Sequence, residues 1–275
     1  MERAWQAAGG LAVDPQIQSA TRLAMQRGPA LRGHRGIDPR LAGFGAAGAL
    51  AAAAAWFALS AEPVYRTQVG EQRLVVLEDG SRVRLNTDTV VQVRYRRAAR
   101  SLELRRGQAF FDVAADPDRP FVVTANAVRV TALGTSFDVR RTDETVQVTL
   151  LEGAVAVAHG DREAAQLTPN QQLTATPEGL SQPRPTDAAE AAGWTTGRLT
   201  FRNVPLRAAI AEMNRYSEDK LVLEAPEQLA QAPVSGVFDV GDAAAFEAAV
   251  EAIFPLQSRP EPGGVRLVPR PSPGS

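Results

Sequence analysis

The sequence contains no cysteine and only two histidines among its 275 residues. Without cysteine, the chain can form neither a disulfide nor a cysteine-ligated zinc or iron–sulfur site. His34 and His159 are the only imidazoles, so a histidine-based metal site or a nucleophile–histidine–acid triad has almost no material to be built from. We therefore expect no catalytic residue, no metal and no cofactor, and an enzyme is the least favoured class of function.

An excess of charge of either sign is also missing, with 30 basic and 31 acidic residues and a formal net charge of −1. Such a chain has no general attraction for nucleic acid or acidic lipid. A local cluster of arginines nevertheless surrounds Tyr95, the single aromatic residue among them. Because platforms for base stacking are missing, we expect a solvated face or an acidic protein partner here and no nucleic acid. The cluster consists of Arg94, Arg96, Arg97, Arg100, Arg105 and Arg106.

Glycine-rich phosphate loops are absent, because neither GxxxxGK[ST] nor GxGxxG occurs. Gly80, Gly107, Gly134 and Gly153 each fall between expected strands and not before a helix. These glycines are therefore expected to make turns.

One long stretch lacks charge altogether, the 21 residues at 41–61. At about 1.5 Å per residue, a helix of this length spans roughly 30 Å, the thickness of the bilayer core. Asp38 and Pro39 are suited to begin the helix, and Glu62 and Pro63 to end it. The stretch predicts a single-pass transmembrane helix. A buried helix of a soluble protein and a cleaved signal peptide are the alternatives, although 40 residues rarely precede the apolar part of a signal peptide.

The flanks of this helix differ in charge. Residues 1–40 contain six arginines, whereas the other flank begins with Glu62 and has only Arg66 nearby. The positive-inside rule then places the N-terminus in the cytoplasm and residues 62–275 in the periplasm, anchored in the inner membrane.

Residues 1–40 are expected to form short helices with too few apolar side chains for a core of their own. The segment is either a disordered tail or a region that orders on a cytoplasmic partner. The apolar residues that would contact this partner are Trp5, Leu11, Ile17 and Leu23.

Residues 66–176 alternate apolar and polar side chains with a period of two. Asp79-Gly80 is a strong tight-turn pair. Short strands at about ten-residue spacing indicate an all-β domain of the sandwich, barrel or solenoid type. The expected strands are residues 74–77, 81–85, 90–95, 101–105, 109–113, 121–124, 128–132, 137–139, 146–150, 154–157 and 172–175.

Residues 177–196 are rich in proline and poor in apolar residues, which predicts a linker with at most one helical turn. Residues 197–270 then alternate strands and helices in the order β-α-β-β-α-β-β, an α+β domain with two helices on one face of a small sheet. The tail at 271–275 is expected to be disordered. The buried helix faces should consist of Leu206, Ala209, Ile210 and Met213, and of Phe246, Ala249, Val250 and Ile253.

The β-rich stretch carries a series of short motifs in a characteristic order. They are Leu77-Glu78-Asp79-Gly80-Ser81, Leu85-Asn86, Gly107, Phe110, Arg119-Pro120-Phe121-Val122-Val123, Ala132-Leu133-Gly134-Thr135 and Leu151-Glu152-Gly153. This stretch resembles the FecR family, membrane-anchored regulators that are paired with extracytoplasmic-function sigma factors. Gln108 and Asn170 depart from the usual pattern, and neither should alter the fold.

The last 75 residues are similar to the C-terminal domain of the same family, which is itself like the short N-terminal domain of secretins and TonB-dependent transducers. The resemblance is carried by Leu199, Phe201, Val204-Pro205-Leu206, Ile210, Met213-Asn214-Arg215-Tyr216, Val234-Ser235-Gly236-Val237-Phe238 and Gly264-Val265.

The resemblance implies an anti-sigma type of signal relay. Its outer part would sense an outer-membrane TonB-dependent transducer through the transducer's signalling domain, as in iron and siderophore uptake. Its cytoplasmic end would bind the sigma factor, and envelope proteases would release it. Family members have a longer cytoplasmic region, so residues 1–40 are expected to be part of a segment that starts upstream. The alternative is a membrane-anchored scaffold or envelope-binding module without sigma regulation.

Two sites follow from the resemblance. A sheet edge of the C-terminal domain can accept a partner strand, and the candidates are Leu199, Phe201, Val234, Val237 and Phe238. Some family members cleave themselves at a Gly-Thr bond, which here is Gly134-Thr135. The alternative is that Gly134 makes a tight turn and Thr135 begins a strand.

Overall fold

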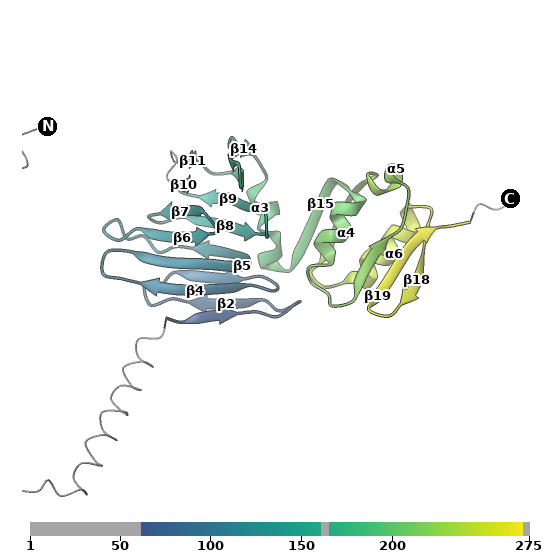
Figure 1. The fold of residues 1–275 in the computed structure, drawn as a ribbon, viewed down its shortest axis with the longest axis horizontal. Coiled ribbons are helices and arrows are strands. Elements are labelled where there is room, and N and C mark those ends of the chain that lie inside the picture. Colours follow the sequence, from purple (N-terminus) through teal and green to yellow (C-terminus); the bar gives the residue numbers. More distant parts are fainter. Residues whose placement is uncertain (1–61, 161–164, 272–275) are drawn as a thin grey trace, which may run out of the picture. The chain divides into compact units, whose positions relative to one another are not determined.

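The computed structural model describes residues 62–160 and 165–271 (Figure 1). Within these residues, no helix combines the length and the apolarity needed to cross a bilayer. The predicted membrane helix at residues 41–61 lies outside the described residues, and so does the expected tail beyond Pro271. The same holds for the predicted cytoplasmic contact residues Trp5, Leu11, Ile17 and Leu23.

The described part of residues 64–185 consists of strands with no helix between them (Figure 1), which confirms the all-β prediction for this region. Two expected strands, at 101–105 and 109–113, are one continuous strand. The strands are β1 (Val64–Arg66), β2 (Arg73–Val76), β3 (Arg82–Leu85), β4 (Val90–Tyr95), β5 (Arg100–Asp112), β6 (Phe121–Ala125), β7 (Val128–Ala132), β8 (Ser136–Arg141), β9 (Val146–Glu152), β10 (Val155–His159), β11 (Ala165–Leu167), β12 (Gln171–Thr176), β13 (Gly179–Leu180) and β14 (Arg184–Pro185).

The long strand β5 belongs to two groups of paired strands. Its first half pairs with β4 and, in parallel, with β6, and its second half pairs with β3 and β8. The change occurs at Gly107, whose φ is +85°. A Cβ at Gly107 would overlap the side chain of Thr89, so both the backbone conformation and the space require glycine here.

One hydrophobic core joins the two groups of strands. Phe111, from the second half of β5, contacts Phe121 of β6 edge to face at 6.0 Å between ring centroids and stacks on Phe137 of β8 at 5.1 Å. Leu85 and Leu104 are completely buried. The fourteen strands are connected as one sheet around this shared core, which agrees with the predicted all-β domain.

The segment predicted as a linker is folded and packed. After β13 and β14 it forms the helix α3 (Ala188–Ala191), capped by the Asp187 side chain, and the 3-10 helix η1 (Gly193–Thr196). Trp194 is only 2% exposed. The helical turn expected in this segment is present as α3, and the few apolar residues are buried by tertiary contacts that local composition does not show.

The C-terminal elements follow the predicted order, with one additional short helix. They are β15 (Arg198–Pro205), α4 (Leu206–Met213), β16 (Lys220–Leu223), α5 (Glu227–Ala230), β17 (Pro233–Asp239), α6 (Ala243–Ile253), β18 (Leu256–Glu261) and β19 (Gly264–Pro269). The strands form two sheets, β15-β17 and β16-β19-β18, so the prediction of a single small sheet is wrong. Strand pairing depends on long-range packing, which the sequence pattern alone does not reveal.

The helix faces agree with the sequence pattern except at two positions of α6, because Ala249 is only partly buried and Ile253 is exposed. All four residues predicted on α4 are buried, and Asp242 caps α6 by accepting a hydrogen bond from the backbone of Ala245. On α6, Phe246 and Val250 are buried, but Ile253 is 67% exposed. Ile253 is the last residue of the helix, where the chain turns toward β18 and no element covers this side chain.

Candidate functional site

The edge strands of the C-terminal domain expose less apolar surface than predicted. Leu199, Phe201 and Val234 are 5–7% exposed, so their side chains belong to the core, and a partner strand could pair here only through the backbone. They belong to the C-terminal core, where the ring of Phe201 lies 5.9 Å from that of Phe246. Alternation along the strands turns them inward.

Two features keep this sheet available to a partner. Within the described residues, β15 and β17 pair only with each other, so each strand has an outer edge. Val237 of β17 is 58% exposed, whereas Phe238 packs partly against the core. A strand with a free outer edge and an exposed apolar residue is the feature that β-augmentation uses.

The predicted cleavage bond lies in the short connection between β7 and β8. Gly134 is exposed, whereas Thr135 is 6% exposed. The hydroxyl of Thr135 is buried and has no hydrogen-bond partner among the described residues. A buried unpaired hydroxyl costs about 1–3 kcal/mol. The oxygen that would attack the Gly134 carbonyl is therefore not engaged in another interaction.

The Gly134-Thr135 bond is closely packed on two sides. Gly153, with φ of +85°, lies so near that a Cβ would come within 2.6 Å of Thr135 Cγ2 and 2.9 Å of the Gly134 carbonyl oxygen. On the other side, a Cβ at Gly134 would come within 3.1 Å of Ala115. Only small residues fit around this peptide group.

A buried arginine supports the loop that contains Ala115. The guanidinium of Arg100 donates hydrogen bonds to the carbonyl oxygens of Ala114 at 2.8 Å and Arg119 at 2.9 Å, and to the carboxylate of Asp79 at 2.8 Å. Burial alone would raise the pKa of Asp79, but hydrogen bonds from Ser81 and Arg100 outweigh it and lower this pKa. Arg100 thus holds the loop against Gly134.

The burial of Arg100 corrects the prediction of one exposed arginine cluster. Its side chain is 0% exposed, so it cannot contribute to a surface patch. Arg94 and Arg96 form ion pairs with Glu62, at 2.7 and 2.6 Å. Two further members of the cluster, Arg105 and Arg106, line the cleft described below.

A buried carboxylate joins the sheet domain to the segment that follows it. Asp138 of β8 accepts hydrogen bonds from Gln108 Nε2 and from Trp194 Nε1, both at 3.0 Å. Its burial raises the pKa of Asp138 to about 6, although the two hydrogen bonds oppose the shift. A cavity of about 390 Å³ adjoins these groups.

Further polar contacts connect the sheet domain to α4. Glu212 binds both Arg140, at 2.7 Å, and Arg215. Burial would raise the pKa of Glu212, but the charges of the two arginines outweigh it and lower this pKa. Asn86 donates a hydrogen bond of 2.8 Å to the hydroxyl of Tyr216. This junction is held mainly by hydrogen bonds and ion pairs.

The described residues contain no group of three or more acidic or histidine side chains arranged to hold a metal ion. Gly80 and Gly153 lie between strands with positive φ, as predicted for turn glycines, whereas Gly107 has positive φ but lies within the continuous strand β5, so the turn prediction is wrong there.

Comparison with protein families identifies the sheet domain. Residues 63–156 match the family described as FecR protein. The chain carries a FecR domain. The resemblance inferred from the motifs is thereby confirmed for this region. No curated protein sequence matches the chain.

Solved structures extend the similarity beyond the FecR domain. Two crystal structures of a proposed anti-sigma factor from Parabacteroides distasonis ATCC 8503, at 1.65 and 2.50 Å resolution, are each 27% identical to this chain. Their TM-scores are 0.66 and 0.65, and they cover 76% and 77% of this chain and 100% of their own. The similarity to secretin and transducer domains stays a prediction.

The sequence reasoning missed the junction between the FecR domain and the C-terminal elements. Phe137 and Val139 point into the sandwich core, so alternation assigns the intervening Asp138 to the solvent side. It is buried because Trp194 covers that side. A single tryptophan in an otherwise polar, proline-rich segment was the signal that could have indicated this contact.

Proposed function

We propose that this chain is a membrane-anchored regulator of a sigma factor of the extracytoplasmic-function type. The single observation that carries the proposal is the similarity to the proposed anti-sigma factor over 76% of this chain, which extends beyond the FecR domain into the C-terminal elements. The chain has no nucleophile–base pair recognised from its sequence, and the proposed activity is regulation without turnover.

The proposed topology rests on the charge distribution around residues 41–61. This segment would cross the inner membrane, with residues 1–40 in the cytoplasm and the FecR domain in the periplasm. The cytoplasmic residues Trp5, Leu11, Ile17 and Leu23 would then contact the sigma factor.

The proposed periplasmic partner is the signalling domain of a TonB-dependent outer-membrane transducer, of the kind used in iron and siderophore uptake. The free edges of β15 and β17 support this part, because an added strand binds through generic backbone hydrogen bonds. Val237 would supply an apolar contact beside that strand.

We further propose that the protein cleaves itself between Gly134 and Thr135. The Thr135 hydroxyl attacks the Gly134 carbonyl carbon, the amide C–N bond breaks, and the acyl group moves to oxygen while the nitrogen takes up a proton. Water then hydrolyses the ester and regenerates the hydroxyl. The buried, unpaired Thr135 oxygen supports this step.

Strand order implies that cleavage would not separate the two halves. In the sheet, β8 pairs with β5 and β10 pairs with β7, so strands after residue 135 alternate with strands before it. A cut chain would remain one folded body held by these pairs. Release to the cytoplasm would instead require envelope proteases acting near residues 41–61, whose three glycines have low helix propensity and ease local unwinding.

A transcription reporter tests the regulatory function. The reporter carries a promoter read by the sigma factor encoded beside this chain, and cells contain the full chain or a variant with Trp5→Ala and Leu23→Ala. We expect the variant to change the reporter signal several-fold, while the polar control Gln16→Ala with Gln26→Ala leaves it unchanged. Identical signals with and without the whole chain would favour the scaffold alternative.

A further inference from the structure

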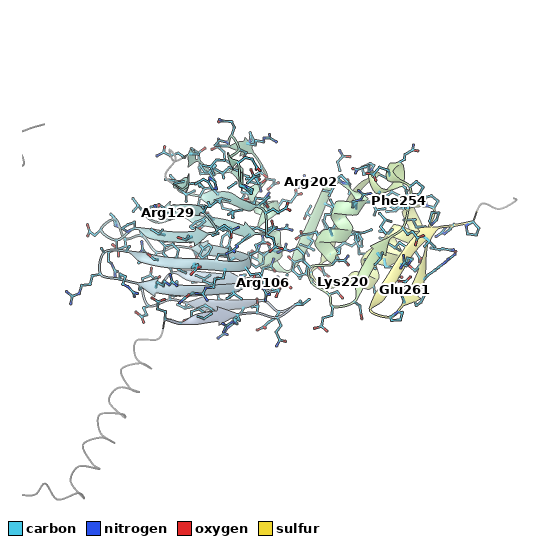
Figure 2. The ribbon with its side chains drawn as sticks, in the orientation of Figure 1. Arg106, Arg129, Arg202, Lys220, Phe254 and Glu261 are labelled. Atoms are coloured by element: carbon cyan, nitrogen blue, oxygen red, sulfur yellow. The ribbon has the colours of Figure 1, made fainter. Side chains whose placement is uncertain are left out.

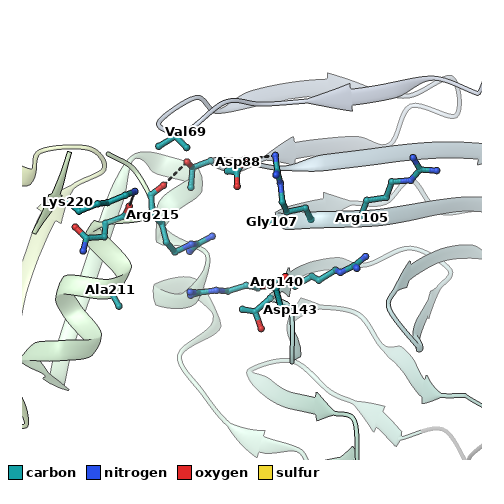
Figure 3. Close-up of a pocket in the computed structure, with 14 residues that line it drawn as sticks. Val69, Asp88, Arg105, Gly107, Arg140, Asp143, Ala211, Arg215 and Lys220 are labelled. Atoms are coloured by element: carbon teal, nitrogen blue, oxygen red, sulfur yellow. Dashed lines mark hydrogen bonds and ion pairs between the residues drawn. The ribbon is translucent and has the colours of Figure 1, made fainter. Parts of the chain in front are cut away.

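A cationic cleft of about 530 Å³ lies beside the junction (Figure 3). The chain as a whole has slightly more acidic than basic residues, so an excess of basic residues in this cleft does not simply reflect the overall composition. Asp88 and Asp143 are the two carboxylates of its lining. The cations that line it are Arg105, Arg106, Arg140, Arg141, Arg215 and Lys220.

Several of these cations are engaged with carboxylates of the same chain. Arg106 forms an ion pair of 2.6 Å with Asp88, and Arg140 and Arg215 share Glu212. Two arginines on one carboxylate leave a net positive charge on the cleft wall. These pairs also fix the arginine side chains, which lowers the entropy cost of binding a ligand.

Two other cations interact only with neutral groups. Arg141 donates a hydrogen bond of 3.0 Å to the carbonyl oxygen of Leu104, and Lys220 Nζ donates to the carbonyl oxygens of Asn214 and Ser217. No carboxylate within residues 62–160 and 165–271 forms an ion pair with either Arg141 or Lys220. Their charges are therefore available to an external anion.

The shape of the cleft favours an extended ligand over a single small anion. Its cations come from separate elements, with Arg141 ending β8 and Lys220 beginning β16. In Figure 3, Arg215 and Lys220 project from the C-terminal elements, and Arg105 and Arg140 from the sheet strands.

We propose that this cleft binds a polypeptide segment of a partner protein that carries consecutive Asp and Glu residues. The carboxylates of such a segment would reach Arg141 on the FecR domain and Lys220 on the C-terminal domain together. Aromatic side chains for base stacking are absent from the cleft lining, which disfavours nucleic acid. The inference does not depend on sigma regulation or on self-cleavage.

Binding of a labelled hexaglutamate peptide to the full chain, purified in detergent at low salt, tests the inference by fluorescence anisotropy. We expect saturable binding that weakens with added salt, and no binding of hexaglutamine. The variant Arg141→Gln with Lys220→Gln should bind roughly tenfold more weakly, a loss of about 1.4 kcal/mol.

The matched control is Arg129→Gln, an exposed arginine on β7 that lies far from Arg106 and Lys220 in Figure 2. It should bind hexaglutamate like the unmodified chain. Lys220→Gln alone should weaken hexaglutamate binding several-fold. Because the Lys220 side chain is exposed, this loss of affinity would not result from a change in how Arg141 supports the fold. The proposal would be overturned if Arg129→Gln weakened hexaglutamate binding as much as Arg141→Gln with Lys220→Gln does. It would also be overturned if hexaglutamate showed no saturable binding, or if a single-stranded oligonucleotide of equal charge bound more tightly.

Discussion

The indole of Trp194 donates a hydrogen bond of 3.0 Å to the carboxylate of Asp138, and both side chains are buried. Asp138 lies on β8 of the FecR domain, whereas Trp194 belongs to the short 3-10 helix before the C-terminal domain. The contact therefore anchors the connecting segment on β8, the strand that begins beside the Gly134-Thr135 bond.

Asp138 should make stability depend on pH in the acidic range. Its native pKa of about 6 exceeds its ordinary value of 3.8, so the native state holds a proton that the unfolded state releases between these values. The stability contribution of this group is full below pH 3.8 and is lost as pH rises through about 6. Relative to Asp138→Asn, the unmodified chain should lose on the order of 3 kcal/mol across this window.

Chemical unfolding of both proteins at a series of pH values from 3.8 to neutrality measures this difference in the free energy of unfolding. The comparison cancels the other titrating groups, which the two proteins share. Parallel stability curves for the two proteins would show that Asp138 titrates at its ordinary value.

The buried ion pair of Arg100 and Asp79 should matter far more than an exposed pair in the same domain. Arg100→Met leaves a buried carboxylate unpaired and should lower the free energy of unfolding by about 3–5 kcal/mol. The matched variant Arg82→Met removes an exposed pair with Asp112 and should cost less than about 1 kcal/mol. Urea unfolding measures both, and equal losses would contradict the structural role assigned to Arg100.

Self-cleavage should require the Thr135 hydroxyl. On a denaturing gel, the full chain should give two fragments, and mass spectrometry should show one ending at Gly134 and one beginning at Thr135. Thr135→Ala should remain a single band, Thr135→Ser should still cut, and the neighbouring control Thr131→Ala should cut normally. An uncut unmodified chain would eliminate self-cleavage and leave Gly134 as an ordinary turn residue.

The free outer edge of β17 should contribute to binding of the transducer's signalling domain. Val237→Lys places a charge on an exposed position and should weaken this binding roughly tenfold without affecting folding. Leu74→Lys is the control, because Leu74 is similarly exposed, at 50%, on β2 of the FecR domain. Co-purification of the two proteins measures the effect, and unchanged binding by the Val237 variant would place the contact elsewhere.

Sequence patterns predicted the elements well where local rules decide them. Alternation located most strands of the FecR domain, and the Asp242 cap and the Leu206–Met213 stripe located the helices. The patterns failed where long-range packing decides. Arg100 is an arginine in a core, and its partners come from two other segments, the turn at Asp79 and the connection between β5 and β6.

The candidate sites show the same division. The sequence identified Gly134-Thr135 through its motif, and the packing of Gly153 around that bond appears only in three dimensions. Leu199, Phe201 and Val234 were assigned to a partner because strand residues of either face look alike in sequence. The cleft lined by Arg141 and Lys220 joins residues almost eighty positions apart and could not be recognised from spacing.

Binding of the sigma factor is the most direct test of the proposed regulatory function. The full chain, tagged at its C-terminus and solubilised in detergent, is used to pull down the sigma factor encoded beside it. We predict that the sigma factor co-purifies with the full chain and is lost when residues 1–40 are removed. Equal recovery with and without residues 1–40, or no recovery with the full chain, would contradict a role in sigma regulation.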